Sequence, residues 1–218
     1  MKTALVFGSS GLIGGHLLNE LIKNDNYSKI KLFVRSDHGS NDSKTEIIKT
    51  DFNNLENHKE DIKGDDCFFC IGTTKQNSPD KNEYKRVELD VPKKIAQIAK
   101  SNLVNSFVFV SSGYADPNSS GDYLKFKGLV EEELKRLSFS KLGIMRPSFL
   151  MGDRKEKRVG EKVGIFIFKL LSPLFLGPLK KMKPIHSKKV AKAMIKITNG
   201  DFKQNVFESN EIVEVSNS

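Results

Sequence analysis

Short apolar runs alternate with segments of helical periodicity along most of this chain. Strands that alternate with helices are typical of βαβ units, whose right-handed crossovers build a parallel sheet. We therefore predict an α/β fold with a doubly wound parallel sheet flanked by helices. The expected strands are 3–8, 29–35, 45–51, 65–72, 106–113 and, with the loop beyond it, 141–152. The clearest expected helices are 12–24, 83–102 and 123–137, with Pro92 either bending the second or marking its start. The stretch 184–197 is expected to return to the core and continue as an amphipathic helix.

The glycine-rich stretch GSSGLIGG directly follows the first expected strand. Gly8 would close the strand, Gly11 would let a pyrophosphate approach the backbone, and Gly14 would let the next helix pack closely. The amino end of that helix favours an anion, and Ser9 and Ser10 add hydroxyl donors. The stretch predicts dinucleotide binding in a Rossmann-type sheet, with a purely structural glycine turn as the alternative.

The end of the second expected strand indicates which nucleotide is bound. An acidic residue at this place takes the ribose hydroxyls of NAD, whereas an arginine accommodates the 2′-phosphate of NADP. The chain has Arg35 here, followed by Asp37. We expect NADP(H) as the preferred cofactor, and Asp37 leaves NAD(H) open.

Further cofactor contacts are expected where the third and fourth strands end. Asp51 and Phe52 follow the third strand and are placed to meet an adenine edge. Ile71, Gly72 and Thr73 end the fourth, where small residues let a cofactor pass. These positions follow from the rule that open α/β sheets bind ligands at the carboxyl ends of their strands.

A Tyr-x-x-x-Lys pair opens the helix after the fifth strand. Tyr123 and Lys127 share one helix face because residues four apart are neighbours on a helix. A nearby ammonium stabilises a phenolate and makes a tyrosine a usable acid or base. Ser111 and Ser112, at the end of the fifth strand, could hold a carbonyl oxygen for Tyr123 to protonate.

Together these motifs resemble the atypical, extended-type short-chain dehydrogenase/reductase superfamily. Within it, the chain is similar to the Tat-interacting-protein-like oxidoreductase branch and its bacterial epimerase/dehydratase-like relatives. The motifs that carry the resemblance are the glycines at 8–14, IGTT at 71–74, FVFVSS at 107–112, YLKFK at 123–127, IMRPSFLMGDR at 144–154 and GE at 160–161.

The resemblance implies a specific set of roles. Ser112 would be the catalytic serine, with Ser111 as the fallback, Tyr123 the general acid/base, and Lys127 the residue that binds the ribose and assists Tyr123. Pro147 and Ser148 would lie beside the nicotinamide. The phosphates would be held by Ser9, Ser10, Gly11, Leu12 and Ile13, and the 2′-phosphate by Arg35.

The expected function is therefore an NADPH-dependent oxidoreductase that acts on a small carbonyl or alcohol substrate. The alternative, from another class, is a non-catalytic NADP(H)-binding redox sensor that acts through a protein partner. Asp90 stands where many relatives have an asparagine that supports a proton-relay water, which puts that relay in doubt. The short chain beyond the sixth strand disfavours a large bound sugar.

We expect a single domain, 1–218, because no Pro-, Ser- or Gly-rich linker divides the chain. Residues 1–152 would form the nucleotide-binding core and 153–218 a small lid over the substrate. The most apolar stretch, 163–179, contains a lysine and two prolines and falls short of a membrane span. We expect it to roof the pocket or contact a second subunit, with peripheral membrane contact as the alternative.

The formal net charge of +9 fits an anionic ligand or a solvated surface better than nucleic acid, because aromatic residues do not interleave with the basic runs. Cys67 and Cys70 cannot easily join in a disulfide on one strand, and no histidine spacing indicates a metal. His186 is expected to be a surface or hydrogen-bonding residue. The N-terminus lacks a signal-peptide pattern, so we expect a cytoplasmic protein. We also expect it to be a monomer or a homodimer.

Overall fold

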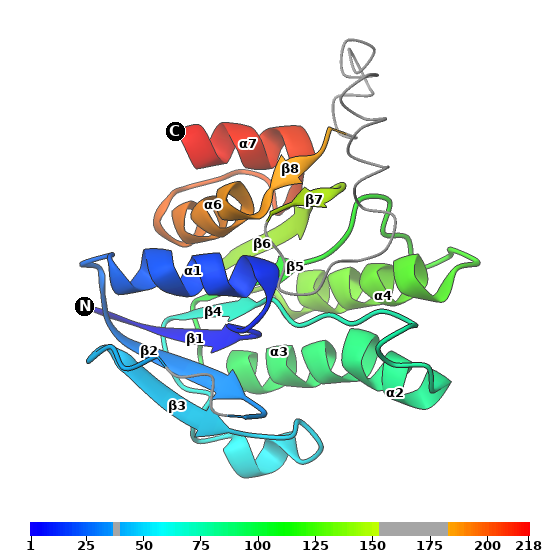
Figure 1. The fold of residues 1–218 in the computed structure, drawn as a ribbon. Helices are drawn as coiled ribbons and strands as arrows, with labels where there is room; N and C mark the ends of the chain where they lie inside the picture. The colour runs from blue at the N-terminus through cyan, green and yellow to red at the C-terminus, as the bar shows by residue number, and fades with distance from the viewer. Residues whose placement is uncertain (37–39, 153–182) are drawn as a thin grey trace.

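A computed structural model of the protein describes residues 1–36, 40–152 and 183–218. Its centre is a seven-stranded sheet whose neighbouring strands all run parallel, in the order β3-β2-β1-β4-β5-β6-β9 (Figure 1). This order confirms the predicted doubly wound sheet. The strands are β1 (Lys2–Phe7), β2 (Tyr27–Val34), β3 (Thr45–Lys49), β4 (Asp66–Phe69), β5 (Ser106–Val110), β6 (Lys141–Arg146) and β9 (Val206–Glu208). A separate short pair is formed by β7 (Leu150–Met151) and β8 (Ile185–His186).

Helices cover both faces of the sheet, as the alternation of elements predicts. In Figure 1, α1, α6 and α7 lie over one face, and α3 and α4 lie over the other. The helical elements are α1 (Leu12–Ile22), η1 (Leu55–His58), α2 (Lys81–Lys85), η2 (Arg86–Asp90), α3 (Val91–Ser101), α4 (Asp122–Leu137), α6 (Ser187–Asn199) and α7 (Ser209–Asn217).

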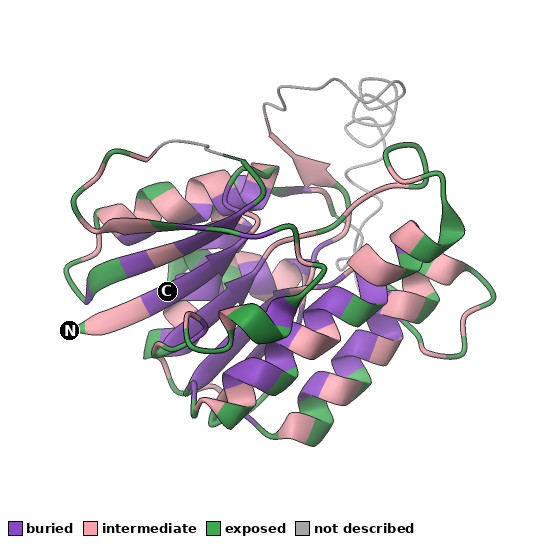
Figure 2. Cartoon of the chain, turned by 90° about the horizontal axis from the view of Figure 1, so that it is seen from below, coloured by how far each residue is buried: buried purple, intermediate pink, exposed green. Residues whose placement is uncertain are grey.

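The two layers give the molecule two apolar cores, one on each side of the sheet. Along β1, Ala4 and Val6 pack into the core beneath α1 and α6, whereas Leu5 and Phe7 pack into the core against α3 and α4. Because these strands are buried on both faces, their sequence reads as a continuous apolar run. Burial of a valine, leucine or phenylalanine side chain contributes about 1.5 to 3 kcal/mol. Figure 2 shows that the strands of the sheet and the inner faces of the helices supply the buried surface.

The segment predicted as one helix over 83–102 is divided by a π-helical turn. α2 is followed by the turn η2, and α3 begins at Val91 with Pro92 in its first turn. Proline has no backbone N–H, and its ring clashes with the carbonyl four residues earlier, which here belongs to Glu88. A regular α-helix is thus blocked at Glu88, and the turn widens there.

Residues 183–218 belong to the packed layers of the sheet. The amphipathic helix predicted within 184–197 is present as α6, which packs against α1, and β9 pairs with β6 at the sheet edge. We expected 153–218 to act as a lid; residues 153–182 of that segment, including the apolar stretch 163–179, lie outside the described residues. Among the described residues, no helix has the length and apolarity that crossing a bilayer demands.

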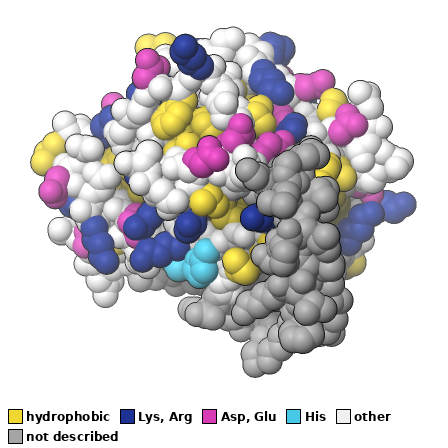
Figure 3. All heavy atoms as spheres, turned by 90° about the horizontal axis from the view of Figure 1, so that it is seen from above, with side chains coloured by type: hydrophobic (Ala, Val, Ile, Leu, Met, Phe, Trp, Pro, Cys, Tyr) yellow, Lys and Arg dark blue, Asp and Glu magenta, His cyan; other side chains and the backbone are white. Residues whose placement is uncertain are grey.

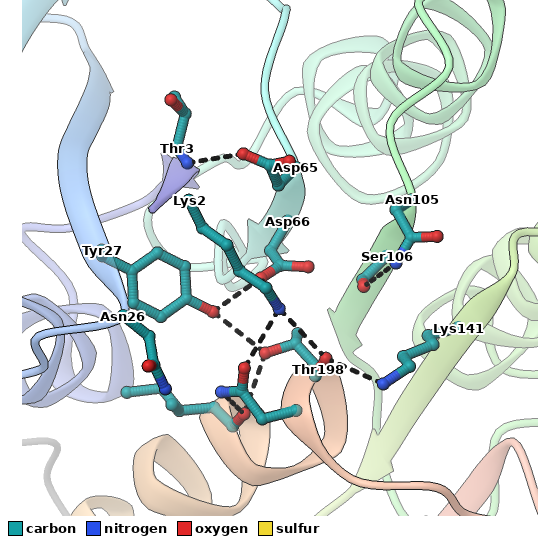
Figure 4. A network of polar contacts seen from close by, with 12 residues as sticks. Lys2, Thr3, Asn26, Tyr27, Asp65, Asp66, Asn105, Ser106, Lys141 and Thr198 are labelled. Atoms are coloured by element: carbon teal, nitrogen blue, oxygen red, sulfur yellow. Dashed lines mark hydrogen bonds and ion pairs between the residues drawn. The ribbon is translucent and has the colours of Figure 1, made fainter.

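A buried polar network lies at the amino ends of the strands (Figure 4). The Tyr27 hydroxyl donates to Asp66 Oδ2 at 2.7 Å and contacts Thr198 Oγ1 at 3.0 Å. Lys2 Nζ lies 3.0 Å from the same Asp66 oxygen and also donates to the Thr198 carbonyl and Asn199 Oδ1. Burial, reinforced by the charge of Asp66, raises the pKa of Tyr27, which keeps its hydroxyl a donor. The network joins β1, β2 and β4 to the end of α6.

Candidate functional site

The glycine stretch that joins β1 to α1 requires glycine at Gly8, where the loop begins, and at Gly14, in the first turn of α1. Gly8 has φ +90°, and a Cβ there would lie 2.9 Å from the Cys70 carbonyl carbon. A Cβ on Gly14 would lie 2.0 Å from the Gly8 carbonyl oxygen. Any side chain at either position would therefore displace the loop from β4 or α1 from the loop.

The amino end of α1 has the features of an anion site. Gly11 is the N-cap, and no side chain among the described residues caps the helix or places an acidic group in its first turn. The first amides of a helix have no intrahelical acceptor, so they and the helix dipole are left for a phosphate. Ser10 and Gly11 are exposed beside them, whereas Ser9 and Ile13 are buried. This loop fits the pyrophosphate of a dinucleotide.

A cleft of about 540 Å³ runs from this loop along the carboxyl ends of the strands. Its lining contains many of the residues predicted to hold a cofactor: Gly8, Ser10, Gly11, Arg35, Asp51, Phe52, Ile71, Gly72 and Thr73. The remaining predicted residues border the loop or lie nearer β5 and β6, outside this lining: Ser9, Leu12, Ile13, Gly14, Lys127, Pro147 and Ser148. The structure thus brings the ends of β1, β2, β3 and β4 around one cleft.

Where β2 ends at the cleft, Arg35 is exposed, and Asp37, two residues further on, lies outside the described residues. A second arginine, Arg86, also lines the cleft and was missed by sequence reasoning. Arg86 pairs in a bidentate manner with Glu83, at 2.7 and 2.8 Å, and donates to the Phe52 carbonyl at 3.2 Å. The Glu83–Arg86 spacing of three residues on a helix is the signal that could have identified this pair.

Asp51 is exposed on the cleft wall. It accepts hydrogen bonds from the Asn53 amide and side chain, at 2.9 and 2.8 Å. These bonds hold the pKa of Asp51 below its ordinary value, so the carboxylate stays ionised.

The tandem serines after β5 have different surroundings. The buried Ser111 hydroxyl donates to Glu131 at 2.5 Å, and Glu131 is also held by Arg146 at 2.6 and 2.9 Å. Ser112 is half-buried, and its hydroxyl makes a long 3.3 Å bond to the carbonyl of Gly113. Ser111 is therefore engaged in a structural network, and Ser112 is better placed to hold a substrate oxygen.

Tyr123 and Lys127 lie on one face of α4, with contrasting exposure. Tyr123 is 39% exposed, whereas Lys127 is buried. Lys127 Nζ lies 5.9 Å from the Tyr123 ring centroid and 4.8 Å from that of Phe109. It also donates to the Val110 carbonyl at 3.3 Å, which places the ammonium under the end of β5, one residue before the serines.

A buried carboxylate that the sequence analysis missed lies beside this lysine. Glu88 Oε2 is 3.0 Å from Lys127 Nζ, and Oε1 accepts a 2.5 Å hydrogen bond from the Thr73 amide. Burial, the largest single influence, lowers the pKa of Lys127. The charge and hydrogen bond of Glu88, together with the charges of Tyr123 and Glu131, more than offset it, and the pKa is raised above its ordinary value. Asp90, which the sequence analysis considered, is exposed and pairs with Lys85 at 2.8 Å.

Pro147 and Ser148 follow β6 next to the serine loop. The Gly113 amide donates to the Pro147 carbonyl at 3.0 Å. The Ser148 amide donates to Ser209 Oγ at 2.7 Å, and its hydroxyl donates to the Lys183 carbonyl at 2.5 Å. These contacts fix the turn beside Ser112.

The cysteines and His186 have structural surroundings. Cys67 and Cys70 are free, and burial raises the pKa of Cys70 to about 12, so its thiol stays protonated in the cleft wall. His186 accepts a hydrogen bond from the Lys188 amide as the N-cap of α6. On the face shown in Figure 3, a group of basic side chains lies beside a histidine. Acidic side chains lie nearer the middle of the same face.

Comparisons with known proteins agree with this geometry. Residues 8–200 match the family model described as NAD(P)H-binding. Protein HTATIP2 of Rattus norvegicus is 34% identical over 166 residues, which cover 73% of this chain and 67% of the relative. The mitochondrial protein FMP52 of Eremothecium gossypii is 29% identical over 221 residues, covering 97% of this chain and 96% of the relative.

Solved structures share the fold at low sequence identity. The UDP-N-acetylglucosamine 4-epimerase of Methanobrevibacter ruminantium superposes with a TM-score of 0.70 at 20% identity, covering 98% of this chain and 80% of the epimerase. Vestitone reductase from alfalfa gives a TM-score of 0.65 at 15% identity, covering 95% and 76%. With the glycine loop and the sheet order, these matches identify the chain as a member of the NAD(P)H-binding family of Rossmann-fold proteins, related to HTATIP2 and FMP52.

Proposed function

We propose that this protein is an NADP(H)-dependent oxidoreductase that acts on a small carbonyl or alcohol substrate. The observation that supports this most directly is the buried Lys127 ammonium, which lies between the Tyr123 ring and the end of β5. A buried charge is costly, and this one lies beside the exposed Tyr123, which carries a titratable hydroxyl. NADPH, when bound, supplies the hydride.

The protein residues handle the substrate oxygen. The Ser112 hydroxyl donates a hydrogen bond to the carbonyl oxygen, and Tyr123 transfers its phenolic proton to that oxygen as hydride reaches the carbon. The Lys127 ammonium stabilises the tyrosinate that remains. In the reverse direction, the tyrosinate accepts the proton of an alcohol.

A substrate panel tests this proposal. Aldehydes, ketones and quinones are offered with NADPH, and its absorbance is followed for the parent, Tyr123→Phe and Tyr114→Phe. We expect one compound class to be reduced and Tyr123→Phe to lower kcat by roughly 10² to 10⁴-fold, the usual contribution of general acid catalysis. Tyr114→Phe removes a hydroxyl from another exposed tyrosine and should match the parent.

Two outcomes would contradict the proposal in different ways. Full turnover by Tyr123→Phe would remove that residue from its role. Tight NADPH binding without turnover of any compound would favour the redox sensor that acts through a protein partner.

The preference for NADP(H) is proposed from Arg35, which is exposed where β2 ends at the cleft. Arg35→Ala should weaken NADPH binding by about 1.5 to 3 kcal/mol, the usual value of a charge-assisted hydrogen bond, and leave NADH nearly unchanged. Calorimetric titration of both nucleotides measures this, with Arg136→Ala as the control outside the cleft lining. Equal losses for the two nucleotides would contradict the assignment.

Cell address and assembly are also proposals. We expect a cytoplasmic monomer or homodimer that does not bind nucleic acid, although the FMP52 relatives are named as mitochondrial. Fractionation of cells that express the full chain, followed by sedimentation of the purified protein, measures both.

A further inference from the structure

Glu88 is a buried carboxylate directly against the wall of the cofactor cleft. A Cβ built on Gly72, a lining residue, would lie 3.4 Å from Glu88 Oε1 and 4.0 Å from Lys127 Nζ. The ion pair between Glu88 and Lys127 therefore lies immediately behind the backbone of the cleft wall.

The local fold holds this carboxylate in place at both oxygens. Oε1 accepts the Thr73 amide at 2.5 Å, and Oε2 faces Lys127 Nζ at 3.0 Å. Apart from that ion pair, Oε2 has no hydrogen-bond partner among the described residues. The carboxylate is thus oriented by the loop after β4 and directs one oxygen at the lysine.

The backbone around Glu88 is specialised. The π-helical turn η2 is an uncommon structure that is frequent at functional sites, and it arises because Pro92 blocks a regular helix at Glu88. Glu88 lies in the middle of that turn. The distortion positions the side chain that meets Lys127.

Other titratable groups around Lys127 cannot replace Glu88. Tyr123 and Glu131 face it from α4, and Cys70 faces it from the residue directly after β4. Glu131 is already neutralised by Arg146 at 2.6 Å, and the Cys70 thiol stays protonated because burial raises its pKa. Tyr84, which lies near Glu88, has a pKa raised to about 12 by burial and by Glu88, so it is neutral as well.

We propose that Glu88 is a positioning residue of the active site, which keeps Lys127 in its ammonium form and fixes Nζ beside the Tyr123 ring. This inference rests on the proposed oxidoreductase function, because it assigns Glu88 to the same proton transfer. A buried ion pair is in general a weak source of stability, since an apolar pair of similar volume often serves as well or better. The proposal gives this pair a role in the site.

The test replaces the charge and keeps the shape. Glu88→Gln retains an oxygen for the Thr73 amide and removes the negative charge. Asp90→Asn is the matched control, because it makes the same change two residues away at an exposed carboxylate. Glu88→Asp restores the charge on a shorter side chain.

We expect Glu88→Gln to lower kcat roughly 10- to 100-fold while the KM for NADPH stays near that of the parent. With the carboxylate gone, the strongest influence that opposes burial at Lys127 is removed, so the alkaline limb of the pH–kcat profile should move to lower pH. Glu88→Asp should recover part of kcat and part of the alkaline limb, and Asp90→Asn should leave both unchanged.

A readout without turnover separates this inference from the proposed function. Lysine labelled at its ε-carbon is titrated by NMR, with the Lys127 signal assigned from a Lys127→Arg variant. Titration of Lys127 at lower pH in Glu88→Gln, but not in Asp90→Asn, supports the inference even if no substrate turns over. An unchanged Lys127 titration, or a loss of kcat without any shift of the pH profile, would overturn it. If Glu88→Gln does not fold, the same two measurements on Glu88→Asp decide, with a smaller shift in the same direction expected.

Discussion

Two lysine–carboxylate pairs lie at opposite ends of the strands of the same sheet. Lys2 pairs with Asp66 at the amino ends of the strands, and Lys127 pairs with Glu88 at the carboxyl ends, each at 3.0 Å. Both carboxylates are buried. The lysine side chains differ, because Lys2 is 31% exposed and Lys127 only 4%.

The two lysines also differ in their remaining neighbours. Lys2 directs its other hydrogen bonds to Thr198 and Asn199, which ties the first strand to the end of α6. Lys127 has a carbonyl and two aromatic rings around it, one of them the half-exposed Tyr123. The Lys2 pair therefore ties elements of the fold together, whereas the Lys127 pair lies behind the wall of the cleft and beside the Tyr123 ring.

The largest effect on stability is expected at the Lys2–Asp66 pair, at the amino ends of the strands. Asp66→Asn should lower the free energy of unfolding by about 2 to 3 kcal/mol, because Lys2 and Tyr27 lose the charge of their buried acceptor while Lys2 remains partly solvated. Urea unfolding measures this change, and NADPH affinity should equal that of the parent. A loss of NADPH binding without a loss of stability would contradict the assignment of a structural role to the Lys2–Asp66 pair.

An intermediate effect is expected from the tandem serines. Ser111→Ala should cost about 1 to 3 kcal/mol of stability, since it removes a donor to the buried Glu131. Ser112→Ala should leave stability nearly unchanged and lower kcat. Thermal unfolding and NADPH turnover of both variants test the assignment, and a larger loss of turnover in Ser111→Ala would reverse the roles.

The smallest effect is expected from the ion pair between Glu133 and Arg136, on the surface of α4. Hydrogen bonds from Arg136 and then Gln97 lower the pKa of Glu133 to about 2, against an ordinary value of 4.5. Its contribution to stability is therefore present above pH 4.5 and is lost as the pH falls towards 2. Glu133→Gln should cost less than about 1 kcal/mol at neutral pH, because the pair is exposed to solvent at Arg136. Urea unfolding at several pH values measures it, and a cost that persists at pH 2 would contradict the ion pair as its source.

Much of the fold could be predicted because its signals are local. Strands buried on both faces give unbroken apolar runs, and Gly8 and Gly14 indicate the tight connection between the first strand and the first helix. β9 was missed because three residues, Val206–Glu208, are too short for a periodic pattern. Its place in the sheet comes from pairing with β6, which no local signal indicates.

The candidate site was less predictable where distant partners decide a side chain's role. Ser111 and Ser112 are adjacent in sequence, and only Glu131 and Arg146 distinguish them. Asp90 was considered because the resemblance places an asparagine there, and Glu88 was missed because the helical pattern alone does not show that its side chain faces inward. That orientation follows from the turn at Pro92, whose consequence for Glu88 requires the three-dimensional structure.

The packing of α6 on α1 has a consequence for synthesis of the chain. α1 begins at Leu12 and α6 at Ser187, so one of the first helices to leave the ribosome waits for one of the last to cover its apolar face. Until then, Leu17 and the other residues of that core are open to water and to other nascent chains. We therefore expect the nascent chain to expose apolar surface longest on this side of the sheet, whereas the opposite core can close as soon as α4 and β6 have been made.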